Sequence, residues 1–175
     1  MNENFTTSTE PFSVRRFETR DHEAVLALWP AAIMHLQPDS DTIDVLINSV
    51  EGAVAGKDHM WVAEASGRIV GSAAVIRVNA SLAHLRCLCV APDFAERHVV
   101  ARGLAEMAIR DAWERGYLKL VVHTNLPPCR LTAALHELGF EYSQERSMGG
   151  EHVLEFYQNL YEQPRLSLSE EGHSF

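Results

Sequence analysis

The chain has 175 residues and a formal net charge of −9 at pH 7, and 46% of its residues are hydrophobic. This size and composition are typical of one globular domain with a substantial core, and they exclude a disordered, fibrous or low-complexity chain. The acidic charge balance argues against general nucleic-acid binding, because recognition of phosphates requires a basic face.

The N-terminal segment MNENFTTSTE has neither a basic start nor an apolar run. No stretch of the chain approaches the roughly 18 apolar residues that a membrane span requires. We therefore expect a cytoplasmic protein that has no membrane partner.

Three cysteines, Cys87, Cys89 and Cys129, and nine histidines are the candidate metal ligands. Neither the C-x-C spacing nor any pair of histidines matches a zinc motif such as H-E-x-x-H. The sequence predicts no metal, and the cysteines are interpreted as core thiols in a reducing compartment.

The first third of the chain predicts one strand followed by two helices. Apolar and polar residues alternate over Phe12–Phe17, which is typical of a half-buried strand. Asp21 is placed to cap the next helix, which Pro30 would end or kink. A second helix is expected in Ser40–Val54, where apolar residues recur at helical spacing.

The middle of the chain predicts an antiparallel hairpin and a third strand. The segment MWVAEASGRIVGSAAVIRV holds two β-rich runs joined by a short turn that contains Gly67. The third strand, His84–Val90, ends where Ala91 and Pro92 interrupt its pattern.

The second half of the chain alternates helical and strand patterns. In order, it predicts a helix over His98–Arg115, a strand over Leu118–His123, a helix from Pro127 or Pro128 to Gly139, and a hairpin of Phe140–Met148 with Glu151–Leu160. A helix between two strands indicates a β-α-β unit with a parallel pair. The chain therefore predicts a single α/β domain with a mixed sheet over residues 12–161, a flexible N-terminus at 1–11 and a mobile tail at 162–175.

Four separated segments make the chain resemble the GNAT superfamily of N-acetyltransferases over about Phe12–Leu160. They are WVAEASGRIVGSA in the hairpin, CLCVAP at the end of the third strand, AWERGYLKLVV and ALHELGF. The resemblance implies a mostly antiparallel sheet in which two central parallel strands splay apart, with helices on both faces. It also implies acetyl-CoA as co-substrate, bound beside the strand that ends at Val90.

The resemblance implies that the pantetheine arm of acetyl-CoA hydrogen-bonds to the splayed strand as an added strand would. Leu88, Cys89 and Val90 are the positions of this contact, and Asn125 lines the far side of the splay. The family's phosphate-binding pattern, Q/R-x-x-G-x-G/A, corresponds here to Ala95–Val100, which lacks both glycines.

Two interpretations of this segment stay open. It is either a modified CoA site or simply the start of a helix. For the first interpretation, amides and positive charge at the helix start would bind the phosphates, although the side chains of His98 and Val100 could crowd the approach. The remaining cofactor-binding candidates are then Arg97, His98, Val99, Val100, Ala101 and Arg102.

The position of the family's catalytic glutamate, six residues before the valine of V-x-P, holds His84. An imidazole can act as general base near neutral pH, although an ordinary strand histidine is the alternative. The usual tyrosine acid of the last helix corresponds to Leu135, which cannot donate a proton. Tyr142 is close in sequence but does not match the motif.

Trp29, Met34, His35 and Trp61 are candidates for the border of an acceptor pocket, with core packing as the alternative for both tryptophans. The resemblance predicts direct transfer of an acetyl group to a primary amine of a small molecule or peptide. The missing glycines and tyrosine leave a second hypothesis, a binding module without efficient catalysis. A homodimer is a further possibility.

Overall fold

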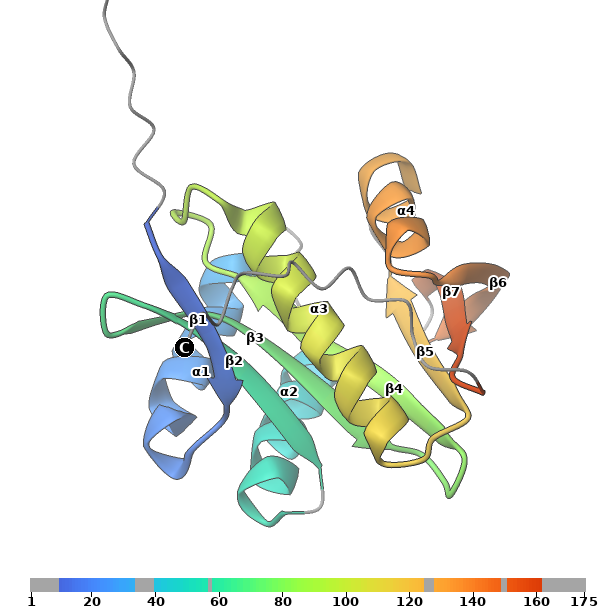
Figure 1. Ribbon diagram of the computed structural model, residues 1–175, viewed down its shortest axis with the longest axis horizontal. Coiled ribbons are helices and arrows are strands. Elements are labelled where there is room, and N and C mark those ends of the chain that lie inside the picture. Colours follow the sequence, from blue (N-terminus) through green and yellow to red (C-terminus); the bar gives the residue numbers. More distant parts are fainter. Residues whose placement is uncertain (1–9, 34–39, 57, 125–127, 149–150, 162–175) are drawn as a thin grey trace, which may run out of the picture.

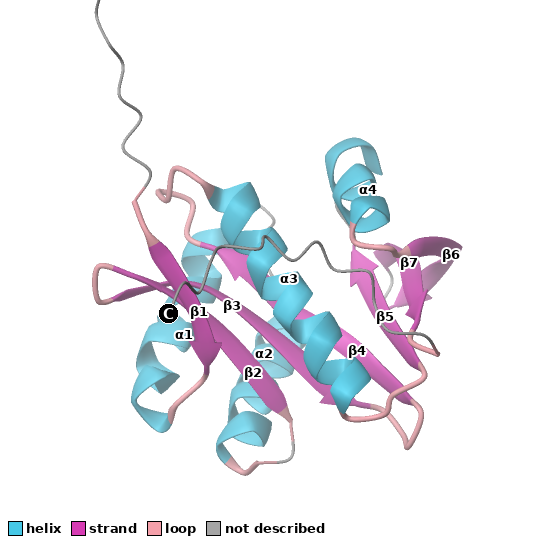
Figure 2. Ribbon diagram, in the orientation of Figure 1, coloured by secondary structure: helices cyan, strands magenta, loops and turns pink. Residues whose placement is uncertain are grey.

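The computed structural model describes residues 10–33, 40–56, 58–124, 128–148 and 151–161. Within these ranges the chain forms one seven-stranded sheet with helices on both faces, as Figures 1 and 2 show. The elements in chain order are β1 (Phe12–Arg16), a 3-10 turn (Thr19–Asp21), α1 (His22–Ile33), α2 (Ser40–Val54), β2 (His59–Ala65), β3 (Arg68–Arg77), β4 (Leu82–Val90), α3 (Arg97–Glu114), β5 (Lys119–Thr124), α4 (Pro128–Glu137), β6 (Glu141–Met148) and β7 (Glu151–Asn159).

The strand order across the sheet is β1-β2-β3-β4-β5-β7-β6. β4 and β5 are parallel because α3 connects them as a crossover, and the other neighbours described are antiparallel. The predicted α/β fold with a mixed, mostly antiparallel sheet is confirmed.

The expected element boundaries agree with the structure to within about two residues, with one informative difference. Pro30 lies inside α1, which continues to Ile33, so the proline does not end that helix. Residues 1–9 and 162–175, where mobile ends were predicted, lie outside the described residues.

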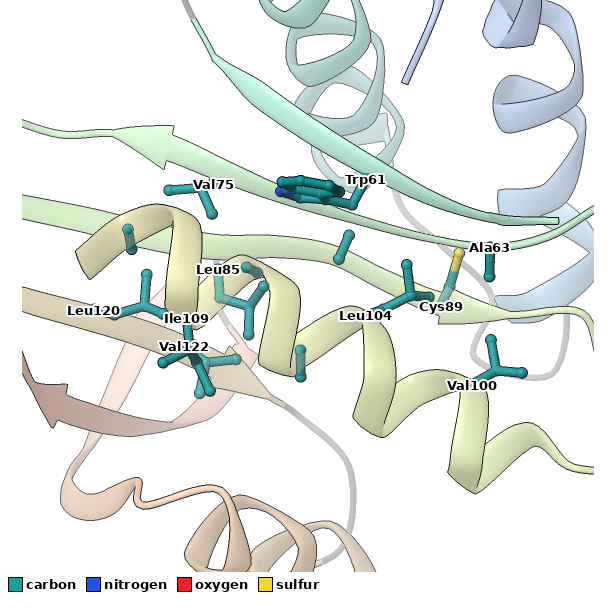
Figure 3. Close-up of a cluster of buried hydrophobic side chains, with 14 of the residues drawn as sticks. Trp61, Ala63, Val75, Leu85, Cys89, Val100, Leu104, Ile109, Leu120 and Val122 are labelled. Carbon is teal, nitrogen blue, oxygen red and sulfur yellow. The ribbon is translucent and has the colours of Figure 1, made fainter. Parts of the chain in front are cut away.

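α3 covers one face of the sheet, and α1 and α2 cover the other (Figure 1). Figure 3 shows the larger core cluster, in which side chains of α3 pack on those of β2 to β5. Its labelled members are Trp61, Ala63, Val75, Leu85, Cys89, Val100, Leu104, Ile109, Leu120 and Val122.

The predicted burial of the thiols is confirmed for Cys87 and Cys89. Burial raises the pKa of Cys87 to about 11 and that of Cys89 to about 12, so neither is a thiolate at neutral pH. The side chain of Cys129 lies outside the described residues. Within the described ranges no helix is long and apolar enough to cross a membrane, and no cluster of three or more potential ligands is arranged for a metal ion.

Gly71 sets the distance between α3 and the sheet. A Cβ built at this position would lie 2.8 Å from Cδ1 of Leu104, 3.0 Å from the carbonyl oxygen of Cys89 and 3.2 Å from Cγ1 of Val100. The first two separations are too short for a well-packed core with a fixed backbone. Glycine at this position therefore lets the first turns of α3 sit directly on β3 and on the end of β4.

We predict that Gly71→Ala lowers the free energy of unfolding by about 1–3 kcal/mol, because the added methyl overpacks the core. Gly103→Ala in α3 is the matched control, since its Cβ would meet nothing closer than 3.6 Å. That variant should gain about 0.5–1 kcal/mol, the usual difference between alanine and glycine in a helix. Urea denaturation of both proteins measures the difference, and equal stabilities would contradict the packing argument.

Candidate active site between β4 and β5

The parallel ladder between β4 and β5 is short. Leu82, Ala83 and His84 pair with Lys119, Leu120 and Val121, and the pairing ends there although β4 continues to Val90. From Leu85 onward, β4 therefore has no strand partner on its β5 side within the described chain. The predicted divergence of the two strands is confirmed, and it begins directly after His84 rather than near Val90.

A β-bulge in β4 accompanies this divergence. The register between β3 and β4 shifts between Ser72 and Ala74, and Cys87 has a φ of 54°, which is unusual for a residue other than glycine. The buried hydroxyl of Ser72 donates a hydrogen bond of 2.9 Å to the Cys87 carbonyl and so holds the bulged residue. Because a bulge bends its strand and increases its twist, it turns the end of β4 away from β5.

The other end of the opening faces the start of α3. The amides of Val99 and Val100 bond to the Glu96 carbonyl at 3.0 and 3.2 Å, whereas those of Arg97 and His98 have no main-chain acceptor among the described residues. The Val100 side chain is fully buried beside Gly71, so it does not crowd this helix start. The side chain of His98 is exposed.

The structure places the cofactor-binding candidates in different environments. Leu88, Cys89 and Val90 lie on the part of β4 that has no β5 partner in the described chain, and Arg97 and His98 lie exposed at the start of α3. Val99 is 39% exposed, and Ala101 is half-buried. Arg102 is engaged by carboxylates, with Nε 2.9 Å from Glu106 and a guanidinium nitrogen 3.7 Å from Glu137. Asn125 lies outside the described residues.

A row of polar side chains crosses the sheet beside the opening. His84 and Arg86 alternate with Leu85, which packs in the α3 core, so they lie on the opposite face of β4. The rings of His84 and His123 are edge to face, with centroids 5.1 Å apart. His123 is the cross-strand partner of Glu155 on β7.

Glu155 is the centre of this row. Its side chain is 10% exposed and bonds to His123 Nε2 at 3.1 Å, to Arg146 Nε at 2.7 Å and to Gln144 Nε2 at 3.1 Å. Burial alone raises the pKa of Glu155, but the hydrogen bonds from Gln144 and His123 and the charge of Arg146 outweigh it and lower the pKa to about 2. The carboxylate is therefore ionised at neutral pH.

The ionised carboxylate fixes the tautomer of His123. Because a carboxylate only accepts hydrogen bonds, Nε2 of His123 carries the proton, and Nδ1 is buried with no partner among the described residues. At His84, Nδ1 lies 3.4 Å from a guanidinium nitrogen of Arg86, which can only donate. Burial, followed by the charge of Arg86, lowers the pKa of His84 to about 4, so its imidazole is neutral at pH 7.

Sequence reasoning identified His84 but missed Arg86, His123 and Glu155. The run LKLVVH indicated a compact apolar strand, and nothing in it placed its terminal histidine opposite Glu155. The signal was a polar residue inside each of three separate strands, and only the register of the strands brings those residues together.

The other candidates are accounted for by packing. Leu135 is 2% exposed in the core, and Tyr142 is 52% exposed on β6 against Phe156. Trp61 is buried in the larger core cluster, and Trp29 is partly buried against both clusters, as the core interpretation expected. Met34 and His35 lie outside the described residues.

A separate cavity of about 780 Å³ lies between α1 and the turn that joins β2 to β3. Its charged side chains are paired: Arg15 binds Asp21 and Glu64, and Arg68 binds Asp93. The remaining lining arginine, Arg20, binds Glu18. These pairs therefore offer a phosphate no free positive charge.

Comparison with known proteins agrees with this geometry. Residues 16–140 match the sequence model of the acetyltransferase (GNAT) family. No curated protein sequence matches the chain.

Three solved structures illustrate the likeness in fold. The ribosomal-protein-S18-alanine N-acetyltransferase of Escherichia coli is 19% identical with a TM-score of 0.69, and the match covers 94% of this chain and 100% of that one. An N-acetyltransferase of Staphylococcus aureus Mu50 is 18% identical with a TM-score of 0.70, covering 86% and 99% of the two chains. The protein YncA of Salmonella typhimurium, whose structure contains its cofactor acetyl-CoA, is 17% identical with a TM-score of 0.69, covering 86% and 95%.

The family model spans well over half of the chain, and the sheet has the opening that the resemblance implies. The chain belongs to the acetyltransferase (GNAT) family and is an N-acetyltransferase of that type.

The pKa of His84 predicts acid-sensitive stability. Its ordinary pKa of 6.5 falls to about 4 on folding, so between these values the unfolded chain binds a proton that the folded protein does not. The resulting contribution to stability is present above pH 6.5 and is lost as the pH falls toward 4.

We expect His84→Asn to reduce the slope of unfolding free energy against pH in this window. Urea denaturation at several pH values between 7 and 4 measures both slopes. Parallel curves for the two proteins would show that His84 does not titrate as its environment implies.

Proposed function

We propose that this protein transfers an acetyl group from acetyl-CoA directly to a primary amine of a small molecule or peptide. The observation that carries the proposal is the end of the β4–β5 ladder after His84, which leaves one side of β4 without a strand partner in the described part of the chain. An extended molecule with amide groups can hydrogen-bond to such an edge as an added strand. The pantetheine arm of CoA is a molecule of this kind.

The residues around the opening fit acetyl-CoA in two further respects. The amides of Arg97 and His98 have no main-chain acceptor among the described residues and lie at the positive end of the α3 dipole, which favours phosphate groups. The loss of the family's glycines is tolerated, because Val100 turns into the core and His98 points to solvent. Leu88 and Val90 would supply the backbone contacts along β4.

Acetyl-CoA supplies an activated acetyl group, and the protein has to provide an unprotonated amine beside it. The neutral imidazole of His84 is the proposed proton acceptor, placed at the last paired position before the opening. With a pKa of about 4 it is a weak base, so its contribution should fall below the usual range for general bases. Leu135 offers no proton, so we assign protonation of the leaving thiolate to solvent.

Two measurements on the purified protein test the proposed function together. Acetyl-CoA should raise the melting temperature, because a ligand that binds only the folded state stabilises it. Release of the CoA thiol should then depend on an added primary amine. Stabilisation by acetyl-CoA without thiol release from a broad amine panel would favour the binding-module hypothesis.

We predict that Arg97→Ala weakens CoA binding by about tenfold or more but leaves the binding of pantetheine nearly unchanged, because a charge-assisted contact to phosphate is worth about 1.5–3 kcal/mol. Calorimetry with both ligands measures the difference. Arg102→Ala is the control, since Arg102 is engaged by Glu106 and Glu137 and should have the smaller effect on CoA. Equal losses for CoA and pantetheine would show that Arg97 does not bind phosphate.

We predict that His84→Ala lowers kcat/KM at neutral pH by about tenfold, the modest effect expected of a weak base. Part of the loss should be recovered at high pH, where the amine loses its proton without help. Thiol release measured from pH 6 to 10 gives both the loss of kcat/KM at neutral pH and its recovery at high pH. A variant with unchanged kcat/KM at every pH would eliminate His84 as the base.

A further inference from the structure

Arg86 is a half-buried arginine that lacks a carboxylate partner in the described part of the chain. Its one hydrogen-bond contact there is the 3.4 Å approach to Nδ1 of His84, which is an uncharged acceptor near the upper limit of hydrogen-bond distance. A guanidinium has five N–H donors, so most of its donors have no acceptor on the described residues.

Arg15 is a second partly buried arginine, and its environment differs from that of Arg86. Arg15 has a side chain that is 24% exposed, and it binds Asp21 at 2.7 Å and Glu64 at 2.7 Å. The nearest carboxylate of the polar row, Glu155, is already occupied by Arg146, His123 and Gln144. Arg86 is therefore the charged member of the row that is left without compensation.

An uncompensated charge of this kind costs free energy. Burial lowers the pKa of Arg86, which is the sign of a cation that has lost water without gaining a counter-charge. A bound anion would offset this cost, and a carboxylate matches the planar guanidinium with two parallel hydrogen bonds.

The position of Arg86 connects this unpaired charge to the proposed reaction. It lies two residues beyond His84 on the same face of β4, within the segment that has no β5 partner. An anion bound to Arg86 would hold the rest of its molecule beside the imidazole. The chain carries a net charge of −9, so an isolated cation at this point is not a consequence of a generally basic surface.

We infer that the acetyl acceptor is an amino carboxylate, such as a free amino acid, whose carboxylate binds Arg86 while its amine lies beside His84. This inference rests on the proposed function and narrows its substrate class. The positive charge of Arg86 also favours the neutral amine over the ammonium, as it does for the imidazole of His84. The amine nitrogen forms the new bond to the acetyl carbon, its proton passes to His84, and the thiolate leaves.

The test compares acceptors that differ only in charge. Thiol release is measured with a set of amino acids and with the corresponding amino amides, and the ratio of the two kcat/KM values is taken for each protein. Arg86→Gln should lower the acid-to-amide ratio by about tenfold or more, because the variant loses a charge-assisted contact made only by the acids. Arg86→Lys should retain part of the preference.

Arg146→Gln is the matched control, because Arg146 belongs to the same row but is neutralised by Glu155. It should leave the acid-to-amide ratio unchanged even if it lowers both rates. An unchanged ratio in Arg86→Gln would overturn the inference, and so would a wild-type protein that prefers the amides after correction for amine pKa.

A binding measurement separates this inference from the proposed function. An N-acetylated amino acid, which carries the carboxylate but no amine, should raise the pKa of His84 followed by NMR in the wild type and not in Arg86→Gln. If the pKa of His84 rises in this way but no acetyl group is transferred to any amine, the proposed acetyl transfer is refuted and carboxylate binding at Arg86 is still supported. Absence of the response in the wild type would overturn the carboxylate site itself.

Discussion

Parallel pairing between β4 and β5 lasts for only three residue pairs, and the candidate active site depends on that interruption. A fully paired ladder would satisfy the backbone groups of β4 internally and leave nothing for an extended ligand to bind. The bulge at Cys87, held by the Ser72 hydroxyl, bends the strand at the point where the opening is needed. Local strain in one strand thus creates the edge at which binding is proposed.

The packing of α3 fixes the second boundary of the opening. Gly71 allows the helix to approach the sheet closely, and Val100 fills the space beside it. This contact places the first amides of α3 near the end of β4, where the strand has no described partner on its β5 side. The same valine that departs from the family's glycine pattern therefore has a core role, and the helix start remains accessible.

The electrostatics of the site follow from the partners available to each charge. The Glu155 carboxylate accepts hydrogen bonds from His123, Arg146 and Gln144, so it stays ionised in spite of burial. Arg86 receives no such partner from the described residues, and burial of His84 together with the charge of Arg86 keeps the imidazole of His84 neutral. An acidic protein thereby keeps one uncompensated cation beside the group proposed to take up the amine proton.

The sequence by itself determined the order of elements, the hairpins and the helices, because periodicity, turn residues and helix ends are local properties. It also indicated His84 and the altered phosphate segment as candidate site residues, since both are read from fixed spacing to the V-x-P motif. The tertiary structure alone decided that His123, Glu155 and Arg86 belong to one polar row. Their meeting depends on the register between β4, β5 and β7, which is set by long-range pairing and by a bulge that no local pattern reveals.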